Sequence, residues 1–192
     1  MGDRPKVLCR DGTELGCTEH AESDALVVEA VPIRRASVDL FDRLARALEW
    51  LERQARDTDV AFAITRDESC PKTLLVDAEK LIWVVSALAG NSLRYVRRGT
   101  RLRPGGSIAV HLATAQGELR IRVADDGPGM PEPAAAVLRG DRAAHENAPA
   151  LALVHDLVAA QGGRVDVRTS QDAFDHGTTV AIALPLAPPG VR

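Results

Sequence analysis

Two adjacent segments with period-two alternation most strongly limit the folds open to this chain. Residues 107–114 and 118–124 alternate apolar and polar side chains, and a Gln116-Gly117 turn signal lies between them. Such alternation predicts two paired strands, each with one face toward a core. A two-stranded hairpin cannot bury that face alone, so other elements must cover it. Only 3% of residues are aromatic, so aliphatic side chains must fill the core.

Three helical patterns could supply the cover. The first, over residues 37–56, starts at Ser37, has Asp39 in its first turn, and repeats apolar residues every three or four positions. The second begins after Asp77, which we expect to cap it, and carries a long apolar stripe. The third is predicted over 150–161, where a Gly-Gly pair stops it.

The remaining patterns complete an α+β fold. Further strands are predicted over 60–65, 73–76, 164–170 and 178–184. The order α-β-α-β-β-loop-α-β-β predicts a two-layer sandwich, in which a mixed β-sheet carries its helices on one face. Residues 134–149 have weak periodicity and no aromatic anchor, so we expect them to be mobile.

The amino-terminal segment has no clear pattern. Residues 6–10 and 26–33 are strand-like, and a hairpin and a partly ordered tail are both open. We expect residues 1–35 to form a tail or short hairpin, 36–187 to form one domain, and 188–192 to form a C-terminal tail. A chain of 192 residues can bury such a core without disulfides or metals.

Composition excludes several classes of protein. The formal net charge of −3 lacks the excess of positive charge that general nucleic-acid binding requires. The longest apolar run, residues 81–90, is about half of a membrane span, so no membrane insertion is expected. Cys9, Cys17 and Cys70 cannot all pair and lack metal-ligand spacing. With no visible signal peptide, a reducing cytoplasm is the predicted location.

Two polar features stand out from this framework. Asn91 interrupts an apolar helical stripe, where its amide must find partners; a core asparagine satisfied by backbone groups is the alternative. After the strand 118–124, the chain reads Asp125-Asp126-Gly127-Pro128-Gly129. A carboxylate at a strand end can accept a hydrogen bond from an exocyclic amine such as that of adenine, and glycine permits close ligand approach. An ordinary Gly-Pro turn is the alternative.

A third feature is the succession near the C-terminus. The helix 150–161 leads through Gly162-Gly163 into a strand, and a Gly177-Thr178 turn opens the last strand. Taken in order, the three features resemble the catalytic ATP-binding domain of bacterial sensor histidine kinases, in the gyrase, heat-shock-90, histidine kinase and mismatch-repair ATPase superfamily. The resemblance covers residues 36–186. It implies a Bergerat-type ATP-binding fold with ATP or ADP and Mg²⁺ as ligands.

The resemblance also implies roles for individual residues. Asn91 matches the asparagine that ligates the nucleotide's magnesium, which favours oxygen ligands. Arg94 takes the position of a basic residue near the phosphates. Tyr95, the only tyrosine of the chain, matches the aromatic residue that packs on the adenine.

The other matches concern the adenine end of the site. Asp125 matches the carboxylate that binds the adenine amino group, and Gly127 and Gly129 match the first glycine box. Thr178 matches the threonine near that aspartate. The resemblance does not imply a catalytic residue in this chain.

The sequence departs from the family at the phosphate end. Ala87 stands one helical turn before Asn91, where the family has asparagine or glutamate, and it can neither accept a proton nor hold a ligand. Residues 148–151 read Ala-Pro-Ala-Leu in place of Gly-x-Gly-Leu, which crowds the helix terminus and removes one amide donor. The lid phenylalanine is absent between Met130 and Phe174.

Two functions follow from this pattern. The first is an adenine-nucleotide-binding, histidine-kinase-like module in two-component signalling, which would phosphorylate a partner in trans if active. The second is a catalytically inactive, pseudokinase-type module that regulates by binding a protein, as an anti-sigma-like factor or phosphotransfer adaptor. The expected partner is a response regulator, a kinase, or a sigma or anti-sigma factor, and a homodimer stays open. The roughly 35 residues before the domain are too few for the phosphoacceptor hairpin of the family, and His20 lacks helical surroundings, so we expect it not to be a phosphoacceptor.

Overall fold

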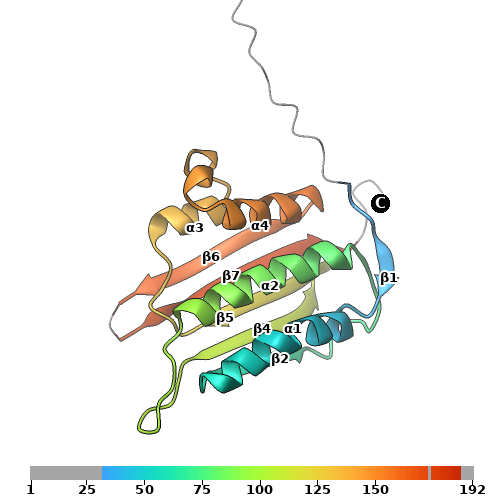
Figure 1. Ribbon diagram of the computed structural model, residues 1–192. Helices are drawn as coiled ribbons and strands as arrows, with labels where there is room; N and C mark the ends of the chain where they lie inside the picture. Colours follow the sequence, from blue (N-terminus) through green and yellow to red (C-terminus); the bar gives the residue numbers. More distant parts are fainter. Residues whose placement is uncertain (1–31, 173, 187–192) are drawn as a thin grey trace, which may run out of the picture.

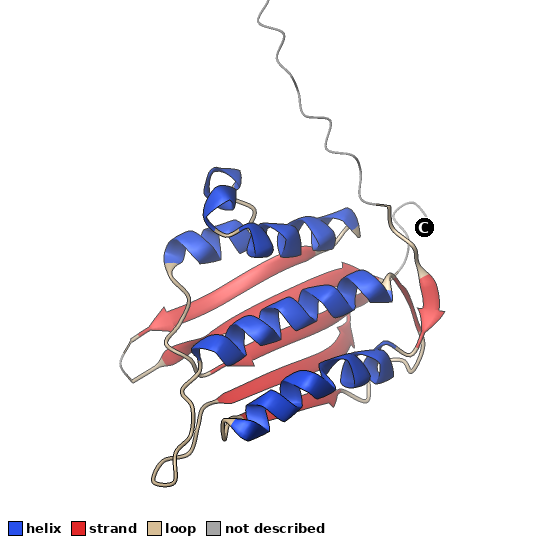
Figure 2. Ribbon diagram, viewed as in Figure 1, coloured by secondary structure: helices blue, strands red, loops and turns tan. Residues whose placement is uncertain are grey.

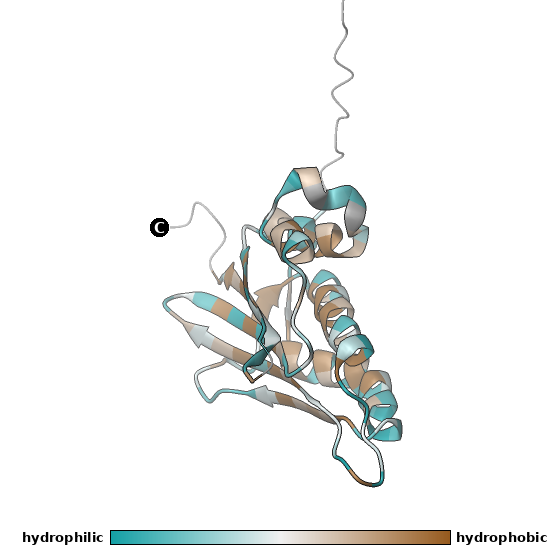
Figure 3. Ribbon diagram, turned by 90° about the vertical axis from the view of Figure 1, so that its left-hand side faces the viewer, coloured by the Kyte–Doolittle hydropathy of each residue, from teal (hydrophilic) through white to brown (hydrophobic). Residues whose placement is uncertain are grey.

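The structure is a computed structural model that describes residues 32–172 and 174–186 (Figure 1). The expectations for residues 6–10 and His20, and nearly all of 26–33, lie outside the described residues. Within them, helices and strands form two layers, as the sequence predicts. Figure 2 shows the helices across one face of a sheet, and Figure 3 shows the two layers from the side. The α+β prediction is therefore confirmed.

The main sheet is mixed and has five strands. The hairpin predicted from alternation forms its centre and pairs Ile108 with Asp125 at one end. The first strand of the sheet pairs in parallel with its neighbour, and the other pairs are antiparallel. In sheet order the strands are β2 (Ala61–Arg66), β4 (Ser107–Ala115), β5 (Glu118–Asp125), β7 (His176–Pro185) and β6 (Arg164–Gln171).

Helices α1 (Leu40–Asp57), α2 (Ala78–Tyr95) and α4 (Pro149–Ala160) cover one face of this sheet (Figure 1). The first begins later than predicted. Ser37 belongs to a short strand, and Asp39 caps the helix by accepting a hydrogen bond from the Asp42 N–H at 3.0 Å. The helix is thus capped by the carboxylate of Asp39 and not by the hydroxyl of Ser37.

The segment 134–149 is not irregular. It contains α3 (Glu132–Leu138) and a 3₁₀ helix (Arg142–Asn147). Val137 and Leu138 are fully buried in this region, and α3 packs against α4 and β6. These residues have regular structure despite their weak periodicity, because contacts with α4 and β6 replace it, and their mobility stays a prediction.

The core between the layers is aliphatic. Leu44, Leu81, Leu112 and Ile121 are fully buried, as expected for a chain with so few aromatic residues. Both tryptophans are partly exposed instead. The described cysteine, Cys70, is buried with a free thiol, and burial raises the pKa of that thiol.

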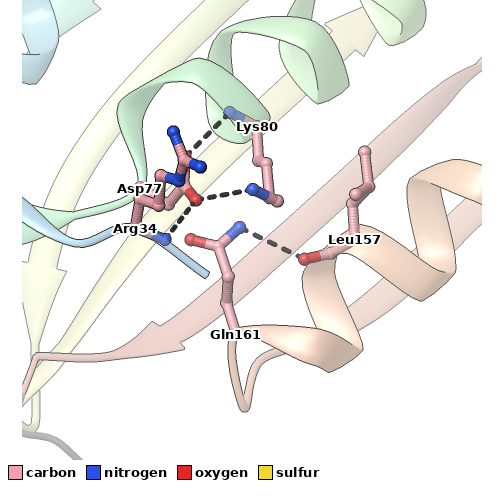
Figure 4. A network of polar contacts seen from close by, with 5 residues as sticks. All are labelled: Arg34, Asp77, Lys80, Leu157 and Gln161. Carbon is pink, nitrogen blue, oxygen red and sulfur yellow. Dashed lines mark hydrogen bonds and ion pairs between the residues drawn. The ribbon is translucent and has the colours of Figure 1, made fainter. Parts of the chain in front are cut away.

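A polar cluster joins the start of the described chain to α2 (Figure 4). Asp77 is only 2% exposed and caps α2 through the Lys80 N–H at 3.2 Å. Its carboxylate also accepts bonds from Lys80 Nζ at 2.7 Å and from the Arg34 N–H at 2.8 Å. Burial would raise the pKa of Asp77, but these bonds outweigh it and hold the pKa below its usual range.

The same lead segment also contacts α4. Arg35 donates from Nη2 to the carbonyl of Gln161, the C-cap of α4, at 3.0 Å. Just after, β1 (Ala36–Val38) pairs antiparallel with β3 (Leu74–Val76), directly before α2. One short segment is thus bonded to the N-terminus of α2 and to the C-terminus of α4.

Candidate functional site

A cavity of about 530 Å³ lies beside the C-terminal half of α2. The end of β5, the loop after it and the start of α4 form its other walls. Its polar lining residues are Asn91, Ser92, Tyr95, Asp125, Gln171 and Thr178. The remaining lining residues are Ala87, Pro128, Gly129, Met130, Pro131, Ala134, Ala148, Pro149, Ala150 and Leu151. An apolar wall with a few convergent polar groups is typical of a small-molecule site.

Asp125 is the acidic group of this cavity. It ends β5, and its Oδ2 accepts a hydrogen bond from Ser92 Oγ at 2.6 Å, while its Oδ1 accepts one from the Gly127 N–H at 3.0 Å. The carboxylate is therefore fixed from a helix on one side and from its own loop on the other. It can accept a further donor, such as an exocyclic amine, from the cavity.

Ser92 is a site residue to which the sequence reasoning gave no role. It is 7% exposed and occupies the apolar stripe of α2 next to Asn91. The signal was present, because a buried hydroxyl on an apolar helical face needs a partner. Its partner is 33 residues away, so the sequence alone did not identify it.

The glycine loop needs glycine for steric reasons. Gly129 has φ +79°, a conformation that side chains rarely adopt, and a Cβ there would clash with the carbonyl oxygen of Ser170. Gly127 has an ordinary φ, but its Cβ would meet Asp125 Oδ1 at 2.9 Å. A side chain at either position would displace the loop or the carboxylate.

A second hydroxyl holds the other side of this loop. Thr169 Oγ1, on β6, accepts a hydrogen bond from the Met130 N–H at 2.6 Å. It also lies 3.4 Å from Oγ1 of Thr178, which pairs with Asp125 across the β5–β7 ladder. Thr169 was missed as well, although strand alternation places it with Val167 on the inner face of β6.

The structure places the predicted site residues in three locations. Asn91, Tyr95, Asp125, Gly129 and Thr178 line the cavity together. Gly127 is buried, donates its N–H to Asp125, and lines an adjoining hollow. Arg94 lies elsewhere, in a groove between α1 and α2 that also includes Trp50. Its guanidinium is 5.8 Å from the centroid of the Tyr95 ring, which is 57% exposed.

The start of α4 forms the opposite wall. Pro149 is the first residue of the helix and has no N–H, and Ala148 caps it without a side-chain bond. The Ala148 N–H donates to the His145 carbonyl at 3.2 Å, and the N–H groups of Leu151 and Ala152 both donate to the Ala148 carbonyl at 3.0 Å. This terminus therefore has few amide donors for an anion.

The donor set does not match a resident magnesium ion. The described residues contain no group of three or more His, Cys, Asp or Glu side chains that could hold a metal. Asn91 offers one amide oxygen, and Ala87, one turn before it, offers none. Both oxygens of Asp125 already accept protein hydrogen bonds. A metal here would depend on ligands from a nucleotide and from water.

None of the four described histidines lines the cavity, and His111 lies on β4 with its Nδ1 2.9 Å from Thr65 Oγ1. His176 opens β7 and its Nδ1 lies 2.8 Å from the Gly127 carbonyl, so it helps to position the glycine loop. His155 is half-buried with Nδ1 3.1 Å from the Leu138 carbonyl. His145 has a buried Nε2 without a hydrogen-bond partner among the described residues.

Comparison with known protein families gives a match that covers the whole cavity. A family model described as "Histidine kinase-, DNA gyrase B-, and HSP90-like ATPase" matches residues 76–188, which is more than half of the chain. The chain belongs to this family. The matched region contains α2, the glycine loop, α4 and β5–β7, and so includes every residue that lines the cavity.

Solved histidine kinase structures share the fold of this ATPase-family chain. The mycobacterial sensor histidine kinase MprB is 26% identical with a TM-score of 0.62, over 81% of this chain and 99% of that structure. Full-length ShkA in complex with AMPPNP is 24% identical with a TM-score of 0.66, over 84% of this chain. This chain spans about a third of that kinase, as 33% of it is covered.

Two further findings complete the comparison. A search of curated proteins finds no match to this chain. In the described part of the structure, no helix is both long and apolar enough to cross a membrane.

Proposed function

We propose that this ATPase-family chain is an adenine-nucleotide-binding module of bacterial signal transduction, which binds its ligand in the cavity beside α2. The observation that carries the proposal is the Asp125 carboxylate, held by Ser92 and Gly127 with its acceptor capacity toward the cavity. Tyr95 supplies an aromatic face at the same cavity. A carboxylate acceptor beside an aromatic ring suits adenine, which has a donor amine and a flat ring system.

In this proposal the predicted residues keep their roles at the adenine end. Asp125 accepts the amino group, Tyr95 packs on the ring, and Thr178 acts near the carboxylate. Gly127 and Gly129 allow the loop its close approach. Mg²⁺ would arrive with ATP or ADP and take one ligand from Asn91, so that phosphates and water would supply the others.

A second candidate function is a catalytically inactive module that regulates by protein binding. Ala87 and the alanine-proline start of α4 favour it, because they remove a ligand and amide donors from the end of the cavity where phosphates would lie. In either case the partner would be a protein of a signalling pathway, such as a response regulator, a kinase, or a sigma or anti-sigma factor, in the cytoplasm. A homodimer is compatible with both.

Calorimetric titration with ATP and ADP, each with and without Mg²⁺, tests the proposal. We expect heat of binding with wild type and a strong loss with Asp125→Asn, whose amide group cannot accept in the same way. Asp126→Asn is the matched control, because Asp126 bonds to Ser107 and does not line the cavity. No binding of either nucleotide to wild type would refute the proposal.

Radiolabelled γ-phosphate separates the two candidate functions. Transfer of label from ATP to a co-purified or co-expressed partner would support a kinase that acts in trans. Nucleotide binding without any transfer, together with retained partner binding by Asp125→Asn, would support the inactive regulatory module.

A further inference from the structure

The polar lining residues of the cavity come from α2, β5, β6 and β7, and none comes from α3 or α4. Asp125, Ser92 and Thr178 lie at the end formed by β5 and β7. The opposite end is formed by the first residues of α4 and by α3, where the lining residues are Ala134, Ala148, Pro149, Ala150 and Leu151. These side chains can contact apolar atoms but cannot neutralise an anion.

No cationic side chain lines this cavity. Within residues 32–172 and 174–186, none of the lining residues is lysine, arginine or histidine. Arg139 follows α3 but is bonded to Glu132 at 2.6 Å and points to the Val167 carbonyl. Arg94 lies in the groove between α1 and α2. Phosphate groups are normally bound by arginine, lysine or a metal ion, because hydration of the anion must be replaced.

Backbone amides do not compensate for the missing cations. Three lining residues, Pro128, Pro131 and Pro149, have no N–H to donate. The Met130 N–H donates to Thr169. At the start of α4, the Ala148 N–H donates to the His145 carbonyl of the preceding 3₁₀ helix, and the Leu151 N–H donates to the Ala148 carbonyl. A helix N-terminus binds anions through free N–H groups, and here most are used or absent.

The fixed charge inside the cavity also disfavours a polyphosphate. Asp125 is the only acidic side chain that lines it, and within the described residues no basic group of the lining balances that charge. Each added phosphate would therefore bring further negative charge into a cavity that already contains the negative carboxylate of Asp125. The same carboxylate accepts a hydrogen bond from the adenine amine, so it attracts the adenine end of a nucleotide and repels the phosphate end.

We propose that the cavity recognises the adenosine portion of its ligand alone, so that adenosine and AMP bind at least as tightly as Mg²⁺-ATP. The proposal rests on the function proposed above and names its ligand class, an adenine nucleoside or its phosphates without selection for phosphate number. Such a module reports the presence of an adenosine compound and does not distinguish ATP from ADP.

Calorimetric titration with adenosine, AMP, ADP and ATP, each with and without Mg²⁺, tests the proposal. We expect affinities that stay within about threefold or fall as phosphates are added, and at most about a threefold gain from Mg²⁺, because Asn91 offers it a single ligand. Mg²⁺-ATP binding at least about tenfold tighter than adenosine would overturn this inference and leave the proposed function intact. No binding of any of the four ligands would refute both this inference and the proposed function.

A charge-introducing variant gives an independent test. Ala150 lines the cavity at the start of α4, so Ala150→Lys adds a cation at the phosphate end. We expect it to tighten ATP relative to adenosine by at least about fivefold. Leu153→Lys is the matched control, since Leu153 lies on the same helix, is 40% exposed and does not line the cavity. Equal responses of both ligands to Ala150→Lys would contradict the inference.

Discussion

Asp77 stabilises the domain through two separable interactions, and its substitution can distinguish them. The carboxylate caps α2 and forms an ion pair with Lys80 at 2.7 Å, while the Arg34 N–H binds the same oxygen. Asp77→Ala removes both the cap and the pair. Asp77→Asn keeps a capping oxygen, because asparagine caps helices as well as aspartate does, and removes only the charge.

The expected magnitudes follow from this geometry. Loss of a cap costs about 1 kcal/mol, and removal of one partner from a buried ion pair costs about 3–5 kcal/mol. The Lys80 side chain is 18% exposed, so it regains part of its hydration. We therefore expect Asp77→Ala to lower the free energy of unfolding by about 2–4 kcal/mol and Asp77→Asn by about 1–2 kcal/mol.

The pH dependence of stability in the same variants shows which protonation state of Asp77 stabilises the fold. The pKa of Asp77 is lowered in the folded chain, so its ionised form adds stability above the unfolded-state pKa of about 4. That stability is lost as the pH falls through the lower folded-state value. The difference between wild type and Asp77→Asn should therefore be constant above about pH 5 and shrink below about pH 4.

Urea unfolding followed by circular dichroism at several pH values measures these differences. Asp39→Asn is the control, since Asp39 caps α1 but its nearest cation, Arg66, is 3.9 Å away. We expect that variant to lose less than about 0.5 kcal/mol. Equal losses for Asp77→Asn and Asp77→Ala, or a difference from wild type that does not shrink as the pH falls below about 4, would refute the reasoning.

Two further predictions concern the site. Ser92→Ala removes the 2.6 Å bond to Asp125 and should weaken adenine-nucleotide binding by about threefold to tenfold in calorimetry, with the fold intact by circular dichroism; unchanged affinity would contradict a positioning role for Ser92. Gly129→Ala should cost about 2–4 kcal/mol in urea unfolding, because φ is +79° and the new Cβ meets the Ser170 carbonyl. Gly117→Ala has a similar φ of +75° but open space, so its loss should be about 1–2 kcal/mol, and equal losses would show that the contact is unimportant.

The elements with strong periodicity could be predicted from the sequence. The stripe of α2 and the alternation of β4 and β5 each report one buried face, and both were found. Helix α3 could not be predicted, because residues 134–149 are rich in alanine and lack a repeating large apolar residue. Val137 and Leu138 are buried by elements far along the chain, and no local pattern encodes such contacts.

The candidate site also contains features that could be predicted from the sequence and features that could not. Asn91 and Asp125 stand out locally, one as an amide on an apolar stripe and the other as a carboxylate at a strand end. The bonds that hold the site, from Ser92 to Asp125 and from Met130 to Thr169, join residues 33 and 39 positions apart. Arg94 shows the converse, because its place in a motif did not determine which groove it lines.

The contacts of Arg34 and Arg35 matter for any shortened form of this protein. Arg34 and Arg35 bond to the N-terminus of α2 and to the C-terminus of α4, and the opposite ends of the same helices line the cavity. A fragment that starts at residue 39 would keep every residue of the cavity and lose the two bonds that join the far ends of its helical walls to one segment. Fragments for ligand screening should therefore include Arg34 and Arg35.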